Sequence, residues 1–277
     1  MKLKENVLIF SDLDGTALAS THKFSDRTKE MVKKVYDKNY YFIPVTARCT
    51  LDTFDQQSIY LGLDKLNGLA AANNGTHIYD FKEKKWIKEE YISAESLKEV
   101  FDITFGKIGK YKVHFIGDDI YYVYGEGENS KYWSDIMKTD YKVIQNFEDI
   151  DRKINHITVI LEKNPSQQSV EEFYKDFSGI SNELDIIKYT ERVYELAIKG
   201  IHKGSVVKEV LNYLGLDKSN TTTFGFGDSF NDFELAAQVE YFIAMGNGLE
   251  ELKNKASFVT KSNDENGVAD FIEKNIL

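Results

Sequence analysis

Two aspartates stand two positions apart at the end of a short apolar run. Residues 7–10, Val-Leu-Ile-Phe, are of the kind buried in a parallel sheet, and Asp12 and Asp14 follow them. Hydrolysing a phosphate monoester requires an in-line nucleophile, cancellation of the charge on the phosphoryl oxygens and a proton for the leaving oxygen. Two carboxylates can share this work when one is ionised and the other holds a proton near neutral pH. Taken alone, the Asp-Leu-Asp-Gly-Thr segment is equally well explained as a polar turn.

A second acidic turn follows another apolar run. Asp228 comes directly after Gly227, at the end of a strand predicted over residues 221–226. Two strands of one parallel sheet would bring both sets of carboxylates to the same edge. An oxygen set of Asp12, Asp228 and the backbone carbonyl of Asp14 suits Mg²⁺, the cofactor that we expect. Asp228 by itself is also a common type of helix cap.

Thr46 and Lys203 supply the other polar groups that a phosphate site needs. Thr46 follows the apolar run 40–45 and can bind a phosphoryl oxygen through its hydroxyl and its backbone N–H. Lys203 precedes Gly204 at the start of a predicted helix and can neutralise phosphate charge. A lysine considered alone is more often a solvated surface residue. The prediction for Lys203 therefore depends on its place among the other motifs.

Four motifs in a fixed order resemble those of one superfamily. They are residues 10–16 (Phe-Ser-Asp-Leu-Asp-Gly-Thr), 45–48 (Val-Thr-Ala-Arg), 202–204 (His-Lys-Gly) and 225–232 (Gly-Phe-Gly-Asp-Ser-Phe-Asn-Asp). With the long insertion between the second and third, they resemble the haloacid dehalogenase (HAD) superfamily of aspartate-nucleophile phosphotransferases, most closely its Cof-like branch with a type IIB (C2B) cap. Residues 72–80 and 260–268 resemble segments of that branch. Ala47 departs from the common Thr-Gly-Arg form, and Arg48 is expected to be a surface or salt-bridge residue.

The resemblance implies a role for each matching residue. Asp12 would attack phosphorus to form an aspartyl-phosphate, and Asp14 would act as general acid and then general base. The other implied roles are phosphate binding by Thr46, Lys203 and Asn231, metal binding by Asp12, Asp228 and the Asp14 carbonyl, and orientation of the metal's water shell by Asp232. Two further candidates for substrate contact are Asn74, equally a turn residue, and Glu195, equally a sheet-packing residue. Phe230 is expected to pack.

Apolar periodicity predicts an α/β core. Strands are expected over residues 7–10, 40–45, 69–72, 221–226 and 241–245, and helices after the cap Ser25, over 204–214 with Gly215 as its stop, and over 229–239. Alternating strands and helices imply a parallel sheet with helices on both faces, which is the Rossmannoid core of the superfamily. Ligands bind beyond the carboxyl ends of such strands, where Asp12, Thr46 and Asn74 fall.

The pattern between residues 81 and 198 is typical of antiparallel α+β structure. It predicts a hairpin of 112–116 and 120–124, a strand over 154–161, a helix over 166–177 and two strands within 185–198. We therefore expect a discontinuous HAD-like catalytic core, residues 1–80 and 199–277, and an α+β cap domain, residues 81–198, inserted between the second and third motifs.

Composition limits the partners. Of the 277 residues, 42% are hydrophobic and 29% charged, as in soluble globular proteins. The formal net charge of −10 argues against nucleic-acid and anionic-membrane surfaces, which attract basic patches. The single cysteine, Cys49, excludes an internal disulfide and is expected to be buried. With no signal-peptide core or membrane-spanning run, we expect a cytoplasmic protein that binds a small phosphate ester; its oligomeric state is not indicated.

The leading hypothesis is a phosphoric monoester hydrolase. It would be a Mg²⁺-dependent phosphatase that acts on a small phosphorylated metabolite, such as a sugar phosphate, through an aspartyl-phosphate. A phosphosugar mutase uses the same aspartyl-phosphate chemistry, so these motifs do not separate the two. A non-catalytic phosphometabolite sensor is a third hypothesis, although a pure binder needs no nucleophile and acid. Release of free phosphate separates the first hypothesis from the other two.

Overall fold

The computed structural model describes residues 1–50, 52–131, 140–180 and 183–277. The chain divides into two compact units. Met1–Ala47, Thr53–Glu89 and His202–Leu277 form one, here the core unit, and Arg48–Asp52 and Glu90–Ile201 form the other, here the inserted unit. The core unit is therefore built from both ends of the chain.

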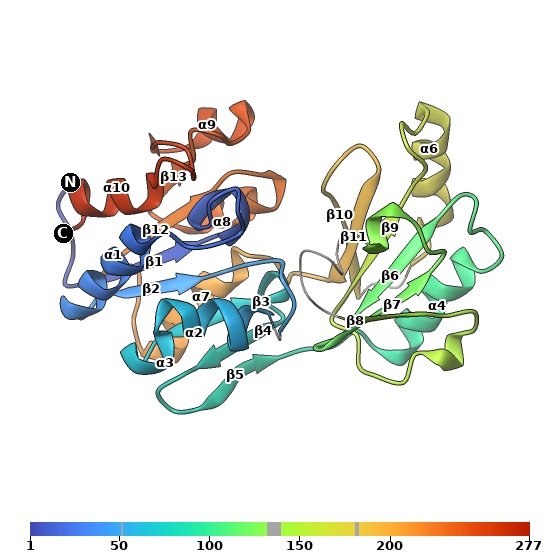
Figure 1. Ribbon diagram of the computed structural model, residues 1–277, viewed down its shortest axis with the longest axis horizontal. Coiled ribbons are helices and arrows are strands. Elements are labelled where there is room, and N and C mark those ends of the chain that lie inside the picture. The colour runs from blue at the N-terminus through green and yellow to red at the C-terminus, as the bar shows by residue number, and fades with distance from the viewer. Residues whose placement is uncertain (51, 132–139, 181–182) are drawn as a thin grey trace. The chain divides into compact units, whose positions relative to one another are not determined.

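A parallel sheet lies at the centre of the core unit (Figure 1). Its strands, in spatial order, are β14 (Phe258–Val259), β13 (Tyr241–Ala244), β12 (Thr221–Gly227), β1 (Asn6–Ser11) and β2 (Tyr41–Pro44). Strands β1 and β12 pair along the whole of β1, with Ser11 opposite Phe226 at the carboxyl end. The residues that follow these two strands are therefore neighbours.

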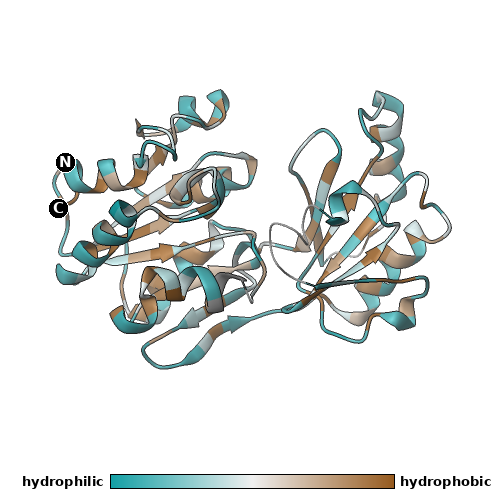
Figure 2. Cartoon of the chain, in the orientation of Figure 1, coloured by the Kyte–Doolittle hydropathy of each residue, from teal (hydrophilic) through white to brown (hydrophobic). Residues whose placement is uncertain are grey.

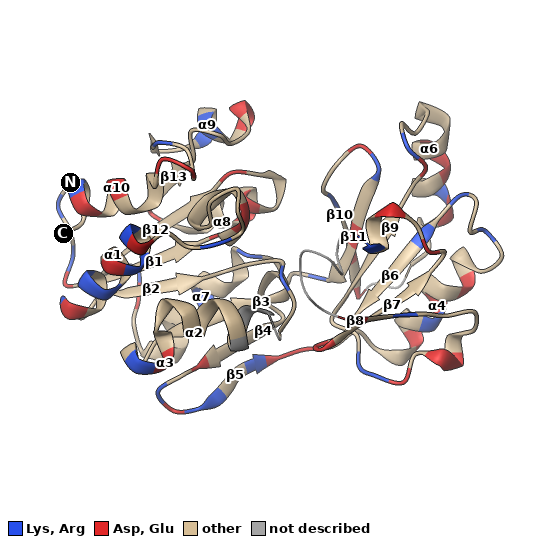
Figure 3. Ribbon diagram, in the orientation of Figure 1, with Lys and Arg blue, Asp and Glu red and all other residues tan. Residues whose placement is uncertain are grey.

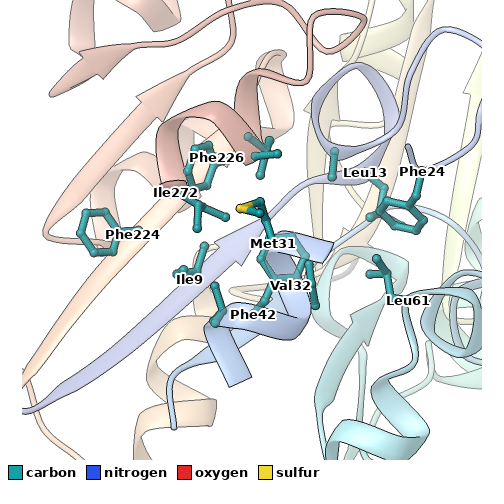
Figure 4. Packing of buried hydrophobic residues seen from close by; sticks show 14 of the residues in the cluster. Ile9, Leu13, Phe24, Met31, Val32, Phe42, Leu61, Phe224, Phe226 and Ile272 are labelled. Atoms are coloured by element: carbon teal, nitrogen blue, oxygen red, sulfur yellow. The ribbon is translucent and has the colours of Figure 1, made fainter. Parts of the chain in front are cut away.

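Helices cover both faces of this sheet. They are α1 (Asp26–Asp37), α2 (Ser58–Leu61), α3 (Leu63–Leu66), α7 (Ser205–Leu214), α8 (Phe233–Gln238), α9 (Glu250–Lys255) and α10 (Gly267–Asn275). On one face, Met31 of α1 and Ile272 of α10 pack with Ile9 of β1 (Figure 4). On the other, Val206 of α7 packs with Leu8. The predicted α/β core is confirmed.

The caps of two helices are as predicted, and one helix differs. The Ser25 side chain accepts a hydrogen bond from the Thr28 backbone N–H at the start of α1, and Gly215 ends α7 in the left-handed conformation. The helix predicted over residues 229–239 begins instead as a 3₁₀ turn, Phe230–Asp232, before α8.

The third predicted parallel strand belongs mainly to another sheet. Strand β3 (Leu69–Ala72) pairs antiparallel with β4 (His77–Asp80), which pairs with β5 (Lys85–Glu89). A single parallel bridge between Val45 and Ala71 connects β3 to the end of β2. The chain reverses because Asn73, Asn74 and Gly75 all have positive φ, which allows a tight turn directly into β4.

The inserted unit contains a six-stranded sheet. Its order is β10 (Leu184–Lys188), β11 (Val193–Ile198), β9 (His156–Ile160), β6 (Lys112–Ile116), β7 (Ile120–Tyr124) and β8 (Asp140–Val143), and its helices include α4 (Ala94–Thr104) and α6 (Gln167–Asp176), with a 3₁₀ turn at Phe147–Asp149. All neighbouring strands are antiparallel except β7 and β8. Phe101 of α4 and Phe173 of α6 belong to one apolar cluster with Phe115 of β6. The predicted hairpin and α+β character are confirmed.

Hydropathy follows burial in both units. The central strands are largely hydrophobic in Figure 2, and the charged residues of Figure 3 fall mainly in helices, in loops and in β5. Strands β1, β2 and β12 carry no charged residue. Within the described ranges, no helix is long and apolar enough to cross a membrane.

Candidate active site

The ends of β1 and β12 bring three carboxylates together. Asp12 follows β1, Asp228 follows β12, and Asp232 lies at the end of the 3₁₀ turn after it. One oxygen from each of these carboxylates lies within 4.8 Å of the other two. The pairing of β1 with β12 therefore brings together residues more than two hundred positions apart in the sequence.

Lys203 reaches this cluster from the segment before α7. Its ammonium donates to Oδ1 of Asp12 at 2.6 Å and to Oδ1 of Asp232 at 2.7 Å, and only 1% of its side chain is exposed. Burial by itself would lower the pKa of Lys203, but the two carboxylates outweigh burial and raise it. The lysine is therefore charged.

Gly204 allows Lys203 to take this position. A Cβ at Gly204 would lie 2.2 Å from the backbone oxygen of Glu234. The start of α7 thus packs directly on the backbone of α8, which itself follows the Asp228 loop. The glycine of the third motif is required by this close approach rather than by its dihedral angles.

Asp232 holds the fourth motif together from inside. Its Oδ2 accepts hydrogen bonds from the backbone N–H groups of Asp228 (2.9 Å) and Ser229 (3.1 Å), while Oδ1 accepts from Lys203. Its side chain is fully buried. A Cβ at Gly227 would lie 2.4 Å from its Cγ, so glycine is needed there too. The predicted orientation of a metal's water shell stays a prediction; the observed contacts fix the loop of Asp228.

The loop after Asp12 wraps around the Asp228 carboxylate. The Thr16 hydroxyl donates to Oδ1 of Asp228 at 2.8 Å. Gly15 has φ +74°, and a Cβ on it would lie 2.5 Å from Oδ2 of Asp228. Only glycine fits both the left-handed backbone and this contact. Thr16 therefore links the loop after β1 to the loop after β12.

The electrostatics of this cluster fit a divalent cation. Burial raises the pKa of Asp12 well above its usual range, against the opposing field of Lys203. Burial, followed by the neighbouring Asp232, raises the pKa of Asp228 to about 6. Three carboxylates face one ammonium, so their negative charge is incompletely balanced. Carboxylate oxygens are the donors that Mg²⁺ prefers, so Asp12 and Asp228 suit this metal.

Asp14 lies at a more open position than Asp12. Its side chain is 39% exposed, and its Oδ1 lies 3.0 Å from Nδ1 of His22. A carboxylate with access to solvent can exchange protons with a leaving group and with water. The sequence does not predict the contact of His22 with Asp14, because the spacing of the two residues fits no regular element. The backbone of His22 is left-handed.

The backbone of Thr46 is already occupied. Its N–H donates to the Ala71 carbonyl at 3.1 Å, and its carbonyl accepts from the Asn74 N–H at 2.9 Å. The prediction that this N–H binds phosphate is therefore wrong, because the N–H takes part in the short bridge to β3. The hydroxyl is still a candidate.

Two asparagines of the predicted site have local roles. Asn74, buried and left-handed at φ 53°, forms part of the turn between β3 and β4. The Oδ1 of Asn231 accepts from the Ser229 hydroxyl at 2.7 Å.

Glu195 belongs to the inserted unit. It is a buried residue of β11, opposite Thr158 of β9. Burial lowers the pKa of the nearby His156, and the Glu195 charge partly counteracts this effect. Contact of Glu195 with a substrate stays a prediction.

Other predicted environments were mixed. Cys49 is buried, as predicted, in a small cluster with Ile116 and Tyr121. Arg48 is also buried rather than on the surface. Phe230, expected to pack, is 41% exposed, although its ring stacks on Phe233 with centroids 6.3 Å apart. It protrudes because the tight 3₁₀ turn directs Asp232, not Phe230, into the interior.

Known proteins are similar to this chain over nearly its whole length. The family of haloacid dehalogenase-like hydrolases matches residues 9–272. The chain is 27% identical over 288 aligned positions to YwtE of Bacillus subtilis, named 5-amino-6-(5-phospho-D-ribitylamino)uracil phosphatase, and the alignment covers 95% of this chain and 96% of YwtE.

Solved structures share the fold. A haloacid dehalogenase-like hydrolase from Bacteroides thetaiotaomicron superposes with a TM-score of 0.82 at 19% identity, covering 98% of this chain and 99% of the other. The HAD subclass IIB sugar phosphatase BT4131 superposes with a TM-score of 0.78 at 20% identity, covering 97% and 98% of the two chains. The fold class inferred from the motifs is confirmed.

Proposed function

This chain belongs to the haloacid dehalogenase-like hydrolase family and is a phosphatase, and we propose that it hydrolyses a small phosphorylated metabolite with Mg²⁺ through an aspartyl-phosphate. Its expected place in the Cof-like, type IIB branch agrees with both the family match and the shared fold. The mechanism, the metal and the substrate class are the proposal.

The buried contact of Lys203 with Asp12 and Asp232 carries this proposal. A cation with 1% exposure, shared by two carboxylates at the end of a sheet, is costly to build for stability alone. It suits a site that must accept a further dianion next to an ionised nucleophile.

The proposed reaction has two steps. A carboxylate oxygen of Asp12 attacks phosphorus, so that an O–P bond forms while the bond to the leaving oxygen breaks. Asp14 gives its proton to that oxygen, and the alcohol leaves. Asp14 then takes a proton from water, which attacks phosphorus, so that inorganic phosphate leaves and the Asp12 carboxylate is restored.

The remaining residues would hold the phosphoryl group. We assign its oxygens to the Lys203 ammonium, the Thr46 hydroxyl and the Asn231 side chain. A Mg²⁺ ion held by Asp12, Asp228 and the Asp14 carbonyl would, when bound, neutralise charge on the phosphoryl oxygens. Asp232 would keep Asp228 and Lys203 in place through the contacts described above.

The proposed substrate is a small molecule with a phosphorylated sugar or sugar-alcohol chain. The name of YwtE specifies a phosphate on a ribityl chain, and BT4131 is named a sugar phosphatase. We take residues 81–198 as a cap that selects the leaving group, with Asn74 and Glu195 as candidate contacts. We also propose that the enzyme is cytoplasmic. Its net charge of −10 argues against a nucleic-acid or membrane partner.

The test is phosphate release from a panel of esters. The panel includes sugar phosphates, sugar-alcohol phosphates and 5-amino-6-(5-phospho-D-ribitylamino)uracil, assayed with Mg²⁺ or with a chelator. We expect metal-dependent release by the wild type and none by Asp12→Asn. Release that survives in Asp12→Asn would refute the nucleophile, and release unaffected by chelation would refute the metal. Absence of release from every ester would favour the mutase or the sensor.

A further inference from the structure

The short turn after β13 touches both carboxylate-bearing loops of the site. This turn, residues 245–249 (Met-Gly-Asn-Gly-Leu), donates from the Met245 N–H to the Gly227 carbonyl at 3.0 Å and from the Leu249 N–H to the Asp228 carbonyl at 2.9 Å. From the same turn, Nδ2 of Asn247 donates to the Gly15 carbonyl at 2.8 Å. The turn therefore fixes the position of one loop relative to the other.

We propose that Asn247 is a positioning residue that holds the Gly15–Thr16 peptide, and with it the Asp14 carboxyl, in place for proton transfer to the leaving oxygen. The inference rests on the proposed function, because it concerns the acid of that reaction. The Asn247 amide donates to a backbone atom of the acid loop, the Gly15 carbonyl. It acts through the backbone.

Both ends of the Asn247 amide are used. Its Oδ1 accepts from the Asn263 N–H at 3.0 Å, and Nδ2 of Asn263 in turn donates to the Leu18 carbonyl at 2.9 Å. Only one orientation of the Asn247 amide satisfies a carbonyl acceptor on one side and an N–H donor on the other. Aspartate at this position would keep the acceptor and lose the donor.

The held peptide is the flexible point of the acid loop. Gly15 has no Cβ to restrict its rotation, and its φ of +74° is one of several conformations open to glycine. Asp14 precedes it, and Thr16, which binds Asp228, follows it. Without the bond to Asn247, rotation about Gly15 would displace Asp14 while Thr16 kept its contact.

The surroundings of the turn also indicate a constrained position. A Cβ at Gly248 would lie 3.0 Å from Cα of Asp228, so the turn packs on the backbone of that loop. Asn247 itself is exposed, and an exposed hydrogen bond adds little to stability. We therefore expect its loss to change the geometry of catalysis more than the stability of the fold.

The test uses leaving groups that differ in their need for a proton. The alcohol of an alkyl phosphate leaves as a strongly basic alkoxide unless its oxygen is protonated, whereas the weakly basic p-nitrophenolate of p-nitrophenyl phosphate leaves without a proton. In Asn247→Ala and Asn247→Asp, we expect kcat/KM for the alkyl ester to fall about tenfold to a hundredfold, which is part of the contribution of a general acid. For p-nitrophenyl phosphate we expect a fall of no more than about threefold, since that ester bypasses the acid.

Ser20→Ala is the matched control. It removes the bond from the Ser20 hydroxyl to Asp264, 2.6 Å long, which joins the chain after Asp14 to the segment of Asn263 without touching Gly15. With Ser20→Ala we expect both esters to react as with the wild type. The melting temperature should fall by no more than about 4 °C in any of the three variants. Equal losses for both esters in the Asn247 variants, or no loss for either, would overturn the positioning role.

The proposed function is checked in the same experiment. Wild type must release phosphate from both esters and Asp12→Asn from neither. If wild type is active and the Asn247 variants show no leaving-group effect, only the inference fails. If wild type releases no phosphate, the proposed function is refuted, and so is the inference that rests on it.

Discussion

A buried ammonium between two carboxylates makes the carboxylate cluster important for the stability of the fold. Lys203→Met keeps much of the side-chain length but removes the charge, leaving Asp12 and Asp232 buried without their cation. We expect the free energy of unfolding at pH 7 to decrease by about 3–5 kcal/mol, as when one partner of a buried ion pair is removed. Urea denaturation measures this change.

Loss of the Lys203 charge should also lower the phosphatase activity. Removing one preorganised charge that faces the transition state typically costs about a hundredfold or more in rate, so phosphate release by Lys203→Met should fall by at least that factor. Lys98→Met is the control, because Lys98 pairs with Asp102 on the exposed surface of α4. If Lys203→Met kept activity within tenfold of wild type, Lys203 would have no place in the phosphate site.

The raised pKa of Asp228 predicts how the stability of the fold depends on pH and on bound metal. Its pKa is about 6 in the folded chain, above the value of about 3.9 for an unfolded aspartate. Between these values the folded state binds the proton more tightly, so the stability contributed by Asp228 is present at low pH and is lost as the pH rises through about 6.

This dependence is measurable as a difference between two variants. With a chelator present, the melting temperature of wild type relative to Asp228→Asn should be higher at pH 5 than at pH 7.5. At pH 7.5, Mg²⁺ should raise the melting temperature of wild type and have little effect on Asp228→Asn, because binding to the folded state alone stabilises it. An identical Mg²⁺ response in both variants would remove Asp228 from the metal site.

At the scale of elements, the packing of α7 on α8 sets the position of Lys203. Gly204→Ala would place a Cβ 2.2 Å from the Glu234 carbonyl oxygen, a backbone atom that cannot rotate away. We expect α7 to shift, with a loss of about 1–3 kcal/mol in stability and a larger proportional loss of activity. Thermal melts and phosphate release measure the two effects.

The control for this helix shift is a glycine with free space around it. Among the residues that the structure describes, a Cβ at Gly179 would meet no atom of a non-neighbouring residue within 4 Å, and the φ of Gly179 is not positive. Gly179→Ala should therefore leave stability and activity nearly unchanged. A Gly204→Ala variant as stable and active as Gly179→Ala would show that the α7–α8 contact does not position Lys203.

The elements also show which parts of the site a sequence can reveal. Asp12 and Asp228 could be predicted because each follows a clear apolar strand, and parallel strands end at one edge. The bond from Thr16 to Asp228 and that from Asn247 to Gly15 join residues 212 and 232 positions apart. No local pattern encodes such pairs, since they depend on how loops pack after the sheet has formed.

The antiparallel pairing of β3 with β4 was not predicted, for a different reason. Its apolar residues fit a buried parallel strand, and Val45 and Ala71 do form one parallel bridge. The turn at Asn73 and Asn74 sends the chain back along β3 into β4, which is the turn role that the sequence left open for Asn74 beside substrate contact. A short apolar run fits either kind of pairing, so the turn that follows decides.

At the scale of the whole molecule, each unit has a hydrophobic core of its own. In the inserted unit, the ring of Tyr194 stacks on Phe173 with centroids 4.2 Å apart, within a cluster that also holds Phe115. All fully buried members of this cluster lie between Ile92 and Leu196. A segment that supplies its own core can fold without the rest of the chain.

We therefore expect residues 90–201 expressed alone to unfold cooperatively on heating. The fragment should be less stable than its counterpart in the full chain, because it lacks Cys49, which packs with Ile116 and Tyr121. Circular dichroism at increasing temperature measures the transition, and Phe173→Ala in the fragment should cost about 3–5 kcal/mol if the transition reports this core. A fragment with no cooperative transition would mean that the inserted unit depends on the core unit to fold.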